Sequence, residues 1–187
     1  MAFDAGRICL DLLATSHPDE RLDSAGALGV WIGGAGLVPS GTSLAHAEGH
    51  WVVRFQELRW LVRQLVLPGG TTPDTGSYGR ALARLNDLAR PAPPVPCAVR
   101  REDGRLARAL AEPPSCSALL ALVARDAVEL LTDPVARAAV RECEGDNCPL
   151  VYLDTSRGRR RRWCSSEVCG NRERVARHRR RAALARA

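Results

Sequence analysis

The sequence predicts a mainly α-helical protein with a small module of a different kind at its C-terminal end. Through most of residues 1–141, apolar residues recur every three or four positions, which is the spacing of one helix face. Two short apolar runs on either side of Asp103-Gly104 indicate a single β-hairpin in this region. From residue 142 onward, closely spaced cysteines and arginines replace the apolar pattern. We therefore expect a helical domain over residues 1–141 and a second, small domain over residues 142–187.

The helices of the first domain are predicted from their apolar spacing and their end signals. Ser24 and Ser115 can cap helices at their first turns, and Pro68-Gly69-Gly70 can end one. The expected helices lie within residues 22–41, 42–70, 78–91 and 115–134. Residues 8–15 are apolar enough for a short buried helix or a strand, and their pattern does not choose between the two. Asp133-Pro134 begins a further helix, "VARAAVREC", that runs into the cysteine segment.

Positive charge is concentrated at the C-terminal end of the chain. Residues 143–187 contain 12 arginines and 5 acidic residues, a net charge of +7, whereas residues 1–142 contain 15 arginines and 16 acidic residues. The chain has no lysine, so part of its arginine usage reflects coding bias. Such a bias acts on the whole chain and cannot produce the step at residue 143. A local excess of this kind indicates an anionic partner.

Four of the seven cysteines form two pairs near the C-terminal end. Four residues separate Cys143 from Cys148, four separate Cys164 from Cys169, and fifteen lie between the pairs. Zinc prefers such thiolate ligands, and two short-spaced pairs can supply the tetrahedron that one structural zinc ion needs. The alternative is a set of buried or redox-active thiols without metal. Zinc is favoured because a module this short cannot build a core alone, and ligation contributes folding free energy.

The segment between and after these pairs predicts a hairpin followed by a helix. "PLVYLDTSRGRRRRW" predicts a strand, a turn at residues 155–158 and a second strand. Residues 171–187 contain no helix breaker and predict a helix, with Val168, Val175 and Ala182 as an apolar stripe that packs on the module. Cysteine pairs that lead from a hairpin into a helix are typical of a treble-clef-like or ribbon-like zinc finger.

The arginines of this module are the candidate nucleic-acid contacts. The predicted second strand carries Arg159, Arg160, Arg161 and Arg162, and the helix carries Arg172, Arg174, Arg177, Arg179, Arg180 and Arg181. Guanidinium groups bind phosphate and guanine through two parallel hydrogen bonds. The module has only Tyr152 and Trp163 as aromatic residues, too few for an RNA-stacking surface, so duplex DNA is favoured. We expect Arg172, Arg174 and Arg177, nearest the metal, to contact base edges and the later arginines to contact phosphates. A solvated basic tail is the alternative.

One charged pair in the first domain is a candidate ligand site. Asp11 stands within an apolar stretch, and Arg7 lies one helical turn before it. A buried carboxylate needs a partner, so the two residues form either a structural ion pair or part of a ligand pocket.

Several short motifs give the chain a family resemblance. "LDTS" at residues 153–156, "RRWC" at 161–164 and "CGNR" at 169–172 resemble the CGNR zinc finger of bacterial proteins. "GRICLDLLAT", "LGVWIGGAGLVP", "LARLNDLAR" and "AVELLTDP" resemble the helical ABATE domain, a stress-induced transcription regulator domain that accompanies this finger. The resemblance implies zinc at the four paired cysteines and binding to DNA.

These observations together predict a non-enzymatic, cytoplasmic, bacterial transcription regulator that binds duplex DNA. No apolar run approaches the roughly 18 residues of a membrane span, and the N-terminus lacks a secretory signal pattern. No combination of nucleophile and base indicates an enzyme. The helical domain is expected to form a homodimer or to sense a stress signal or a small-molecule effector. The alternatives that remain are a zinc-thiolate redox switch and an RNA-binding module.

Overall fold

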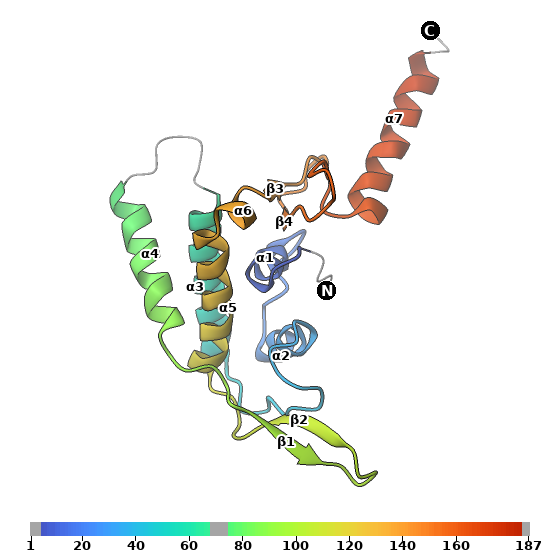
Figure 1. The fold of residues 1–187 in the computed structure, drawn as a ribbon. Helices are drawn as coiled ribbons and strands as arrows, with labels where there is room; N and C mark the ends of the chain where they lie inside the picture. Colours follow the sequence, from blue (N-terminus) through green and yellow to red (C-terminus); the bar gives the residue numbers. More distant parts are fainter. Residues whose placement is uncertain (1–4, 68–74, 185–187) are drawn as a thin grey trace.

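The computed structural model describes residues 5–67 and 75–184. Its first domain is built around three roughly parallel helices, α3 (Gly49–Val66), α4 (Thr75–Ala89) and α5 (Cys116–Thr132). The short helix α1 (Ile8–Leu13) packs on α3 and α5, and α2 (Ala25–Gly34) packs on α3 (Figure 1). Among the described residues, no helix is long and apolar enough to cross a membrane.

The helices predicted within residues 22–41, 42–70, 78–91 and 115–134 are confirmed, and the capping signals explain where two of them begin. Ser24 accepts a hydrogen bond from the amide of Ala27 at the start of α2, and Ser115 accepts one from Ala118 at the start of α5. The ambiguous residues 8–15 form a helix and a following turn of 3₁₀ helix, η1 (Ala14–Ser16). The predicted stop at Pro68-Gly69-Gly70 lies outside the described residues.

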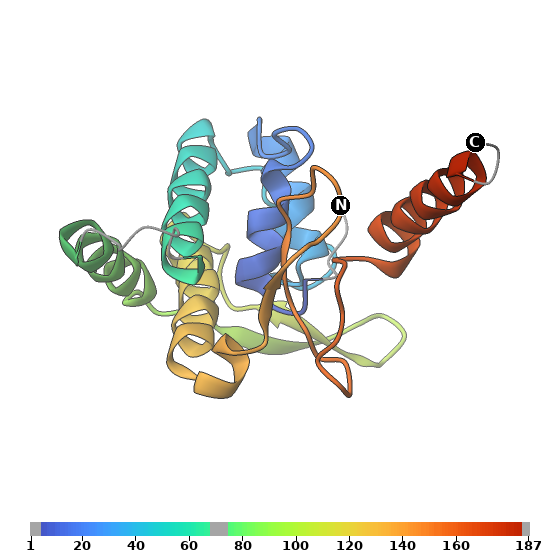
Figure 2. The same ribbon diagram turned by 90° about the horizontal axis from the view of Figure 1, so that it is seen from above.

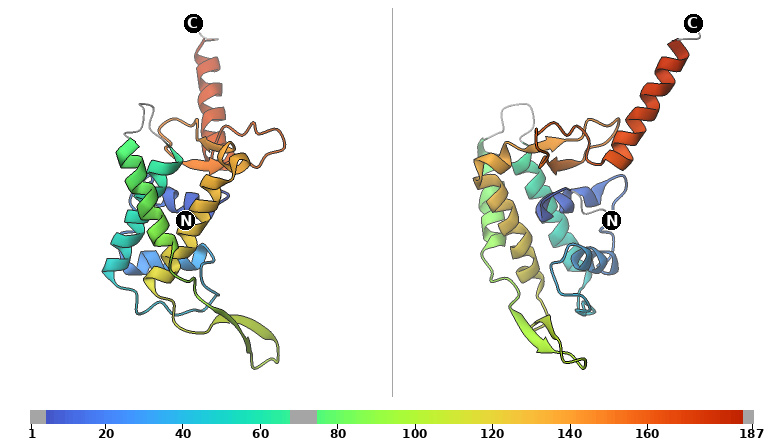
Figure 3. Two further views of the ribbon diagram at one scale, coloured as in Figure 1. Left: turned by 60° about the vertical axis from the view of Figure 1, so that its left-hand side comes forward. Right: turned by 45° about the vertical axis from the view of Figure 1, so that its right-hand side comes forward.

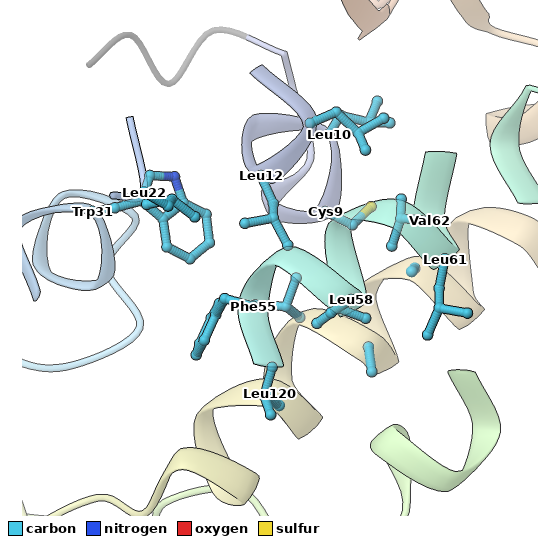
Figure 4. Close-up of a cluster of buried hydrophobic side chains, with 14 of the residues drawn as sticks. Cys9, Leu10, Leu12, Leu22, Trp31, Phe55, Leu58, Leu61, Val62 and Leu120 are labelled. Atoms are coloured by element: carbon cyan, nitrogen blue, oxygen red, sulfur yellow. The ribbon is translucent and has the colours of Figure 1, made fainter. Parts of the chain in front are cut away.

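The core of this domain forms where α1, α2, α3 and α5 meet. Figure 4 shows Leu12 of α1 pointing towards Phe55 and Leu58 of α3, with Trp31 of α2 beside them. The Trp31 and Phe55 rings pack edge to face with their centroids 5.8 Å apart, a favoured geometry for aromatic pairs. The buried side chains of this cluster, each at most 1% exposed, include Cys9, Leu10, Leu12, Leu22, Trp31, Phe55, Leu58, Val62 and Leu120.

The predicted β-hairpin is also confirmed. Strands β1 (Pro96–Arg100) and β2 (Leu106–Leu110) pair antiparallel, with Arg100 opposite Leu106. Gly104 in the turn has φ = 79°, a conformation that glycine adopts without strain. The hairpin extends beyond the ends of the helices at the opposite end of the molecule from the cysteine module (Figures 1 and 3).

The connection into the cysteine module differs from the prediction. The helix that begins at Asp133-Pro134 is the single turn α6 (Pro134–Arg137), not a helix that continues to Cys143. Residues Val140–Glu142 instead form strand β3, which pairs antiparallel with β4 (Val151–Leu153). The backbone of residues 140–142 makes ladder hydrogen bonds with β4, so it cannot remain helical. The predicted boundary between residues 141 and 142 falls within β3.

The second strand predicted for residues 159–162 is wrong. The residues after β4 form an irregular loop, because Arg159 adopts φ = 47° and the Asp154 carboxylate accepts backbone hydrogen bonds from Ser156 and Arg161. The finger hairpin is therefore β3 with β4, and the first cysteine pair lies in its turn. The predicted terminal helix is confirmed as α7 (Asn171–Leu184), which follows a single π-helical turn, η2 (Ser166–Gly170).

The two predicted domains share one hydrophobic core. The amide of Leu153 in β4 donates a hydrogen bond to the carbonyl oxygen of Ala5, 2.8 Å away. Gly6 lies against Leu153 so closely that an added Cβ would be 3.2 Å from the Leu153 Cβ. Val151, Tyr152 and two of the paired cysteines belong to the same buried cluster as the helices. Seen from above in Figure 2, the cysteine module lies over α1, and α7 extends away from it.

Candidate metal centre and nucleic-acid interface

The four paired cysteines converge on one point of the structure. The Sγ atoms of Cys143, Cys148, Cys164 and Cys169 all lie within 4.8 Å of one another, and no other group of three or more potential metal ligands occurs within residues 5–67 and 75–184. The Cys148 and Cys164 sulfurs are 3.7 Å apart, and the Cys164 and Cys169 sulfurs are 3.6 Å apart. Zinc–sulfur bonds of about 2.3 Å in a tetrahedron place neighbouring sulfurs roughly 3.8 Å apart. The sulfur positions therefore fit one zinc ion.

The turn of the β3–β4 hairpin positions the first pair. The amide of Gly145 donates to the Cys143 Sγ at 3.4 Å, and the amide of Cys148 donates to the Gly145 carbonyl oxygen at 3.1 Å. A Cβ added to Gly145 would lie 3.2 Å from the Cys169 Cβ, 3.3 Å from the Cys169 Sγ and 3.4 Å from the Cys143 Sγ. These distances are shorter than ordinary contacts, so a larger residue here would require the cysteines to shift, and glycine avoids this crowding.

The start of the terminal helix positions the second pair. The amide of Cys164 donates to the Cys143 Sγ at 3.3 Å, which ties the two pairs together. The Ser165 hydroxyl then caps the π turn by accepting hydrogen bonds from the amides of Glu167 and Val168. This turn delivers Cys169 two residues before α7 begins at Asn171. A metal held by the four sulfurs thus fixes the first turn of α7 against the hairpin.

The electrostatics of the thiols suit a divalent cation. Burial raises the pKa of Cys143, but hydrogen bonds from the amides of Cys164 and Gly145 and from the thiols of Cys164 and Cys148 together hold this pKa below its ordinary value. Burial raises the pKa of Cys164, and it raises the pKa of Cys169 to about 11. Crowded, partly buried sulfurs cannot all carry uncompensated negative charge, and zinc binding displaces their protons. With four protein sulfurs bound, zinc would keep no position for water and would act as a structural ion.

Two of the arginines predicted to bind DNA hold the loop in place through contacts within the finger. The Arg161 guanidinium lies 4.5 Å from the centre of the Tyr152 ring and donates to the carbonyl oxygens of Trp163, at 2.8 Å, and Cys164. Arg162 forms a salt bridge with Glu144 at 2.6 Å and lies over the Trp163 ring. Arg159 and Arg160 are exposed in the same loop.

The remaining predicted arginines all lie on α7. Arg172, Arg174, Arg177, Arg179, Arg180 and Arg181 are exposed. Glu173 is the acidic residue of the described helix, and it pairs with Arg180 at 2.8 Å. Figure 3 shows the helix extending away from the rest of the molecule in two views. At 3.6 residues per turn, Arg174, Arg177 and Arg181 share one face, while Arg172 and Arg179 lie on the opposite face. The sequence analysis expected Arg172, Arg174 and Arg177 to contact base edges together. On the helix, Arg172 lies on the face opposite Arg174 and Arg177.

The predicted apolar stripe on α7 does not pack against the finger. Val168 is 57% exposed and Val175 is 43% exposed, because the helix leaves the module after its first turn instead of folding back on it. The side chain of Ala182, the third residue of the predicted stripe, lies outside the described part of the structure.

The predicted pair of Arg7 and Asp11 is replaced by other contacts in the described structure. Arg7 forms ion pairs with Asp126 at 2.9 Å and Glu129 at 3.0 Å and so joins α1 to α5. Asp11 is buried and accepts a hydrogen bond from the amide of Ala5 at 3.0 Å. Asp11 also lines a cavity between α1 and the finger, whereas Arg7 is not among the residues that line it. Sequence reasoning missed this cavity because its other walls come from distant segments.

Comparison with known families agrees with this architecture. Residues 6–134 match the ABATE family, which carries the description "Putative stress-induced transcription regulator". Residues 139–182 match the CGNR zinc finger, which includes all four converging cysteines and most of α7. No curated protein matches the chain significantly. The first match spans more than half of the sequence, so the chain belongs to the ABATE family and ends in a CGNR zinc finger with a four-cysteine site for one zinc ion.

Proposed function

We propose that the protein is a non-enzymatic bacterial transcription regulator that binds duplex DNA in the cytoplasm through α7 and the exposed finger loop. The observation that carries this proposal is the position of α7. It is anchored at one end beside the zinc ligands, leaves the body of the molecule, and carries six exposed arginines. The family description supports the regulatory part of the proposal.

The dimensions of α7 suit the major groove. Its 14 residues give a length of about 21 Å, and the groove is about 12 Å wide, which admits one α-helix. Arg174, Arg177 and Arg181 on one face would enter the groove. Arg172 and Arg179 on the opposite face, with Arg159 and Arg160 from the loop, would contact phosphates.

Charge supplies the driving force for this association. Exposed arginines on one short helix repel one another, and within the described helix Glu173 offsets only part of this repulsion. DNA phosphates neutralise the arginines and release condensed counterions, which favours binding at low salt. The repulsion among the arginines of the finger is therefore weaker in the complex with DNA than in the unbound protein.

The aromatic residues of the finger favour duplex DNA over single-stranded RNA. The Tyr152 ring is fully buried, and the Trp163 ring lies beneath Arg162. Recognition of unpaired bases depends on exposed aromatic rings that can stack on them. The contact surface of the finger is therefore the arginine-bearing helix α7, which suits duplex DNA, and not a set of exposed aromatic rings that could stack on unpaired bases.

The helical domain would sense the stress signal or form the homodimer. That domain contacts the finger through α1 and β4, so a change in it can reach α7. The proposal assigns no catalytic step to the protein, because a zinc ion with four cysteine ligands has no open coordination position.

The experiment that tests the proposal compares paired variants in a duplex-binding assay. Fluorescence anisotropy would measure the affinity of the full, zinc-loaded chain for mixed-sequence duplex DNA at about 50 mM salt. We expect the double variant Arg174→Ala/Arg177→Ala to bind at least tenfold more weakly than the unmodified chain. The matched control is Arg105→Ala/Arg108→Ala in the exposed β1–β2 hairpin, which removes the same charge far from α7. Equal weakening by both double variants would contradict a specific role for α7.

A further inference from the structure

A cavity of about 280 Å³ lies at the junction of the helical domain and the zinc finger. Its walls come from α1 and η1, from the segment that leads to α2, from Trp31 of α2, and from the finger around β4 and η2. Small-molecule sites measure roughly 300–1,000 Å³ and occur preferentially between domains. The cavity is therefore close to the size of a small-metabolite site and lies where such sites are common.

This cavity is distinct from the zinc position. A zinc ion would occupy the space enclosed by all four sulfurs, but Cys143 does not line the cavity. The other three cysteines line it together with Trp31 and Thr15, which take no part in the metal centre. A zinc-loaded finger therefore leaves the part of the cavity against these residues available.

The interior of the cavity is mainly apolar. Trp31, Val151 and Tyr152 are among the residues that line it, and each is at most 2% exposed. The hydroxyl of Thr15 is already used, since it donates to the carbonyl oxygen of Leu12 and accepts from Arg59. The Trp31 Nε1 is buried and has no hydrogen-bond acceptor among the described residues. These walls fit a compact apolar or aromatic body.

Two arginines and one histidine also line the same cavity. Arg21 and His17 come from the segment before α2, and Arg172 comes from the first turn of α7. Within the described structure, neither Arg21 nor Arg172 has a side-chain hydrogen bond or an ion pair. Of the acidic groups that also line the cavity, Asp11 and Cys169 are buried, and Cys148 and Cys164 are partly buried. Guanidinium groups without internal partners are suited to bind a carboxylate.

We propose that this cavity binds a small organic acid, with its apolar body against Trp31 and its carboxylate between Arg21 and Arg172. Such a ligand would contact the helical domain and α7 simultaneously. Its carboxylate would occupy Arg172, one of the cations assigned above to DNA phosphates, so binding would lower the affinity for DNA. This regulatory step rests on the proposed function, whereas binding of the acid does not.

Binding is tested without DNA, using benzoate as the probe and benzamide as its neutral isostere. The indole N–H signals of the ¹⁵N-labelled, zinc-loaded full chain would be followed by NMR, with the Trp31 signal assigned from the variant Trp31→Phe. We expect benzoate to shift the Trp31 signal saturably while leaving the signal of Trp60, which is 56% exposed, unchanged. Benzamide should bind at least tenfold more weakly because it lacks the charge. Equal binding of the two probes, or no saturable shift with benzoate, would overturn the proposal.

Two pairs of variants locate the site. Arg21→Gln should weaken benzoate binding at least fivefold, whereas Arg63→Gln, which removes an exposed arginine of α3 outside the cavity, should not. Ala14→Leu places a larger side chain in the cavity wall and should also weaken binding, with Ala83→Leu on the exposed face of α4 as its control. Circular dichroism and zinc content would establish that each variant is folded. Unaltered binding by both Arg21→Gln and Ala14→Leu would place benzoate elsewhere and reject the site.

The regulatory step has its own measurement. Saturating benzoate should raise the Kd of the full chain for duplex DNA several-fold at constant ionic strength, and benzamide should not. If the chain binds benzoate but not DNA, the proposed function fails and the ligand site stands. If DNA affinity is unaffected by saturating benzoate, the regulatory step is wrong.

Discussion

The hydroxyl of Tyr152 donates a hydrogen bond to the carbonyl oxygen of Arg161, 2.5 Å away, while the Arg161 guanidinium lies over the Tyr152 ring. This reciprocal contact joins β4 to the loop that leads to the second cysteine pair. Burial raises the pKa of Tyr152 to about 12, so the hydroxyl keeps its proton and remains a donor at neutral pH. The pair therefore helps to order the loop before Cys164 through contacts that do not involve the cysteine sulfurs.

Tyr152→Phe should destabilise the finger by about 1–3 kcal/mol, because the Arg161 carbonyl oxygen loses its buried donor. Denaturant unfolding of the zinc-loaded chain would measure this change. Arg160→Ala removes an exposed side chain from the same loop and should have little effect. A change below about 0.5 kcal/mol for Tyr152→Phe would show that the hydrogen bond does not order the loop.

Gly145→Ala should weaken zinc binding at least tenfold, because the added methyl group would crowd Cys169 and Cys143. Competition with a chromogenic chelator would measure the affinity. Gly26→Ala in α2, where the added Cβ meets nothing within 4 Å, is the matched control and should bind zinc normally. Unchanged affinity in Gly145→Ala would mean that the cysteine turn is more open than described.

Stability should depend on pH through Glu20. Hydrogen bonds from Arg59 lower the pKa of Glu20 below its ordinary value of 4.5. A carboxyl whose pKa is lower in the folded state stabilises the fold above its unfolded pKa, and this contribution is lost as the pH falls through the folded pKa. Glu20 is 39% exposed, so the contribution should stay below about 1 kcal/mol.

The measurement for Glu20 is the difference in unfolding free energy between the unmodified chain and Glu20→Gln, at pH 7 and in steps below pH 4.5. The difference should shrink as the pH falls. Glu102→Gln, at an exposed site in the β1–β2 turn, should show no such trend. If the difference in unfolding free energy grew as the pH fell, the Glu20–Arg59 ion pair would not account for it.

The zinc site should resist mild oxidation if its role is structural. Cys143 and Cys169 are buried, and metal coordination reduces the reactivity of all four sulfurs. We expect zinc to be retained when the chain is treated with peroxide at a few equivalents, as followed by a colorimetric zinc indicator. Rapid, stoichiometric release would favour the redox-switch alternative.

The sequence predicted those parts of the fold whose signals are local. Ser24 and Ser115 cap the helices they were expected to cap, and Asp103-Gly104 turns the expected hairpin. The cysteine spacing identified the four residues that converge, because the two members of each short-spaced pair are already close in the chain. The finger hairpin was misassigned because β3 comes from a segment, "VRE", whose composition is equally suited to a helix. Only its pairing with β4 makes it a strand.

Contacts between segments that are far apart in the chain could not be predicted from the sequence. Arg7 pairs with Asp126, more than one hundred residues away, and not with its helical neighbour Asp11. The cavity between Trp31 and Arg172 exists only because β4 docks on α1. The division of the α7 arginines into two faces could have been derived from helical spacing alone, once the first residue of the helix was known.

The central claim is that one zinc ion holds α7 in the orientation that binds DNA. The most direct test is the affinity of the full chain for duplex DNA with zinc bound, after removal of zinc by a chelator, and after zinc is restored. We expect at least a tenfold loss of affinity when zinc is removed and its recovery when zinc is restored. The affinity of the zinc-loaded chain should also fall by orders of magnitude between about 50 and 200 mM salt. Equal affinity with and without zinc would contradict the claim.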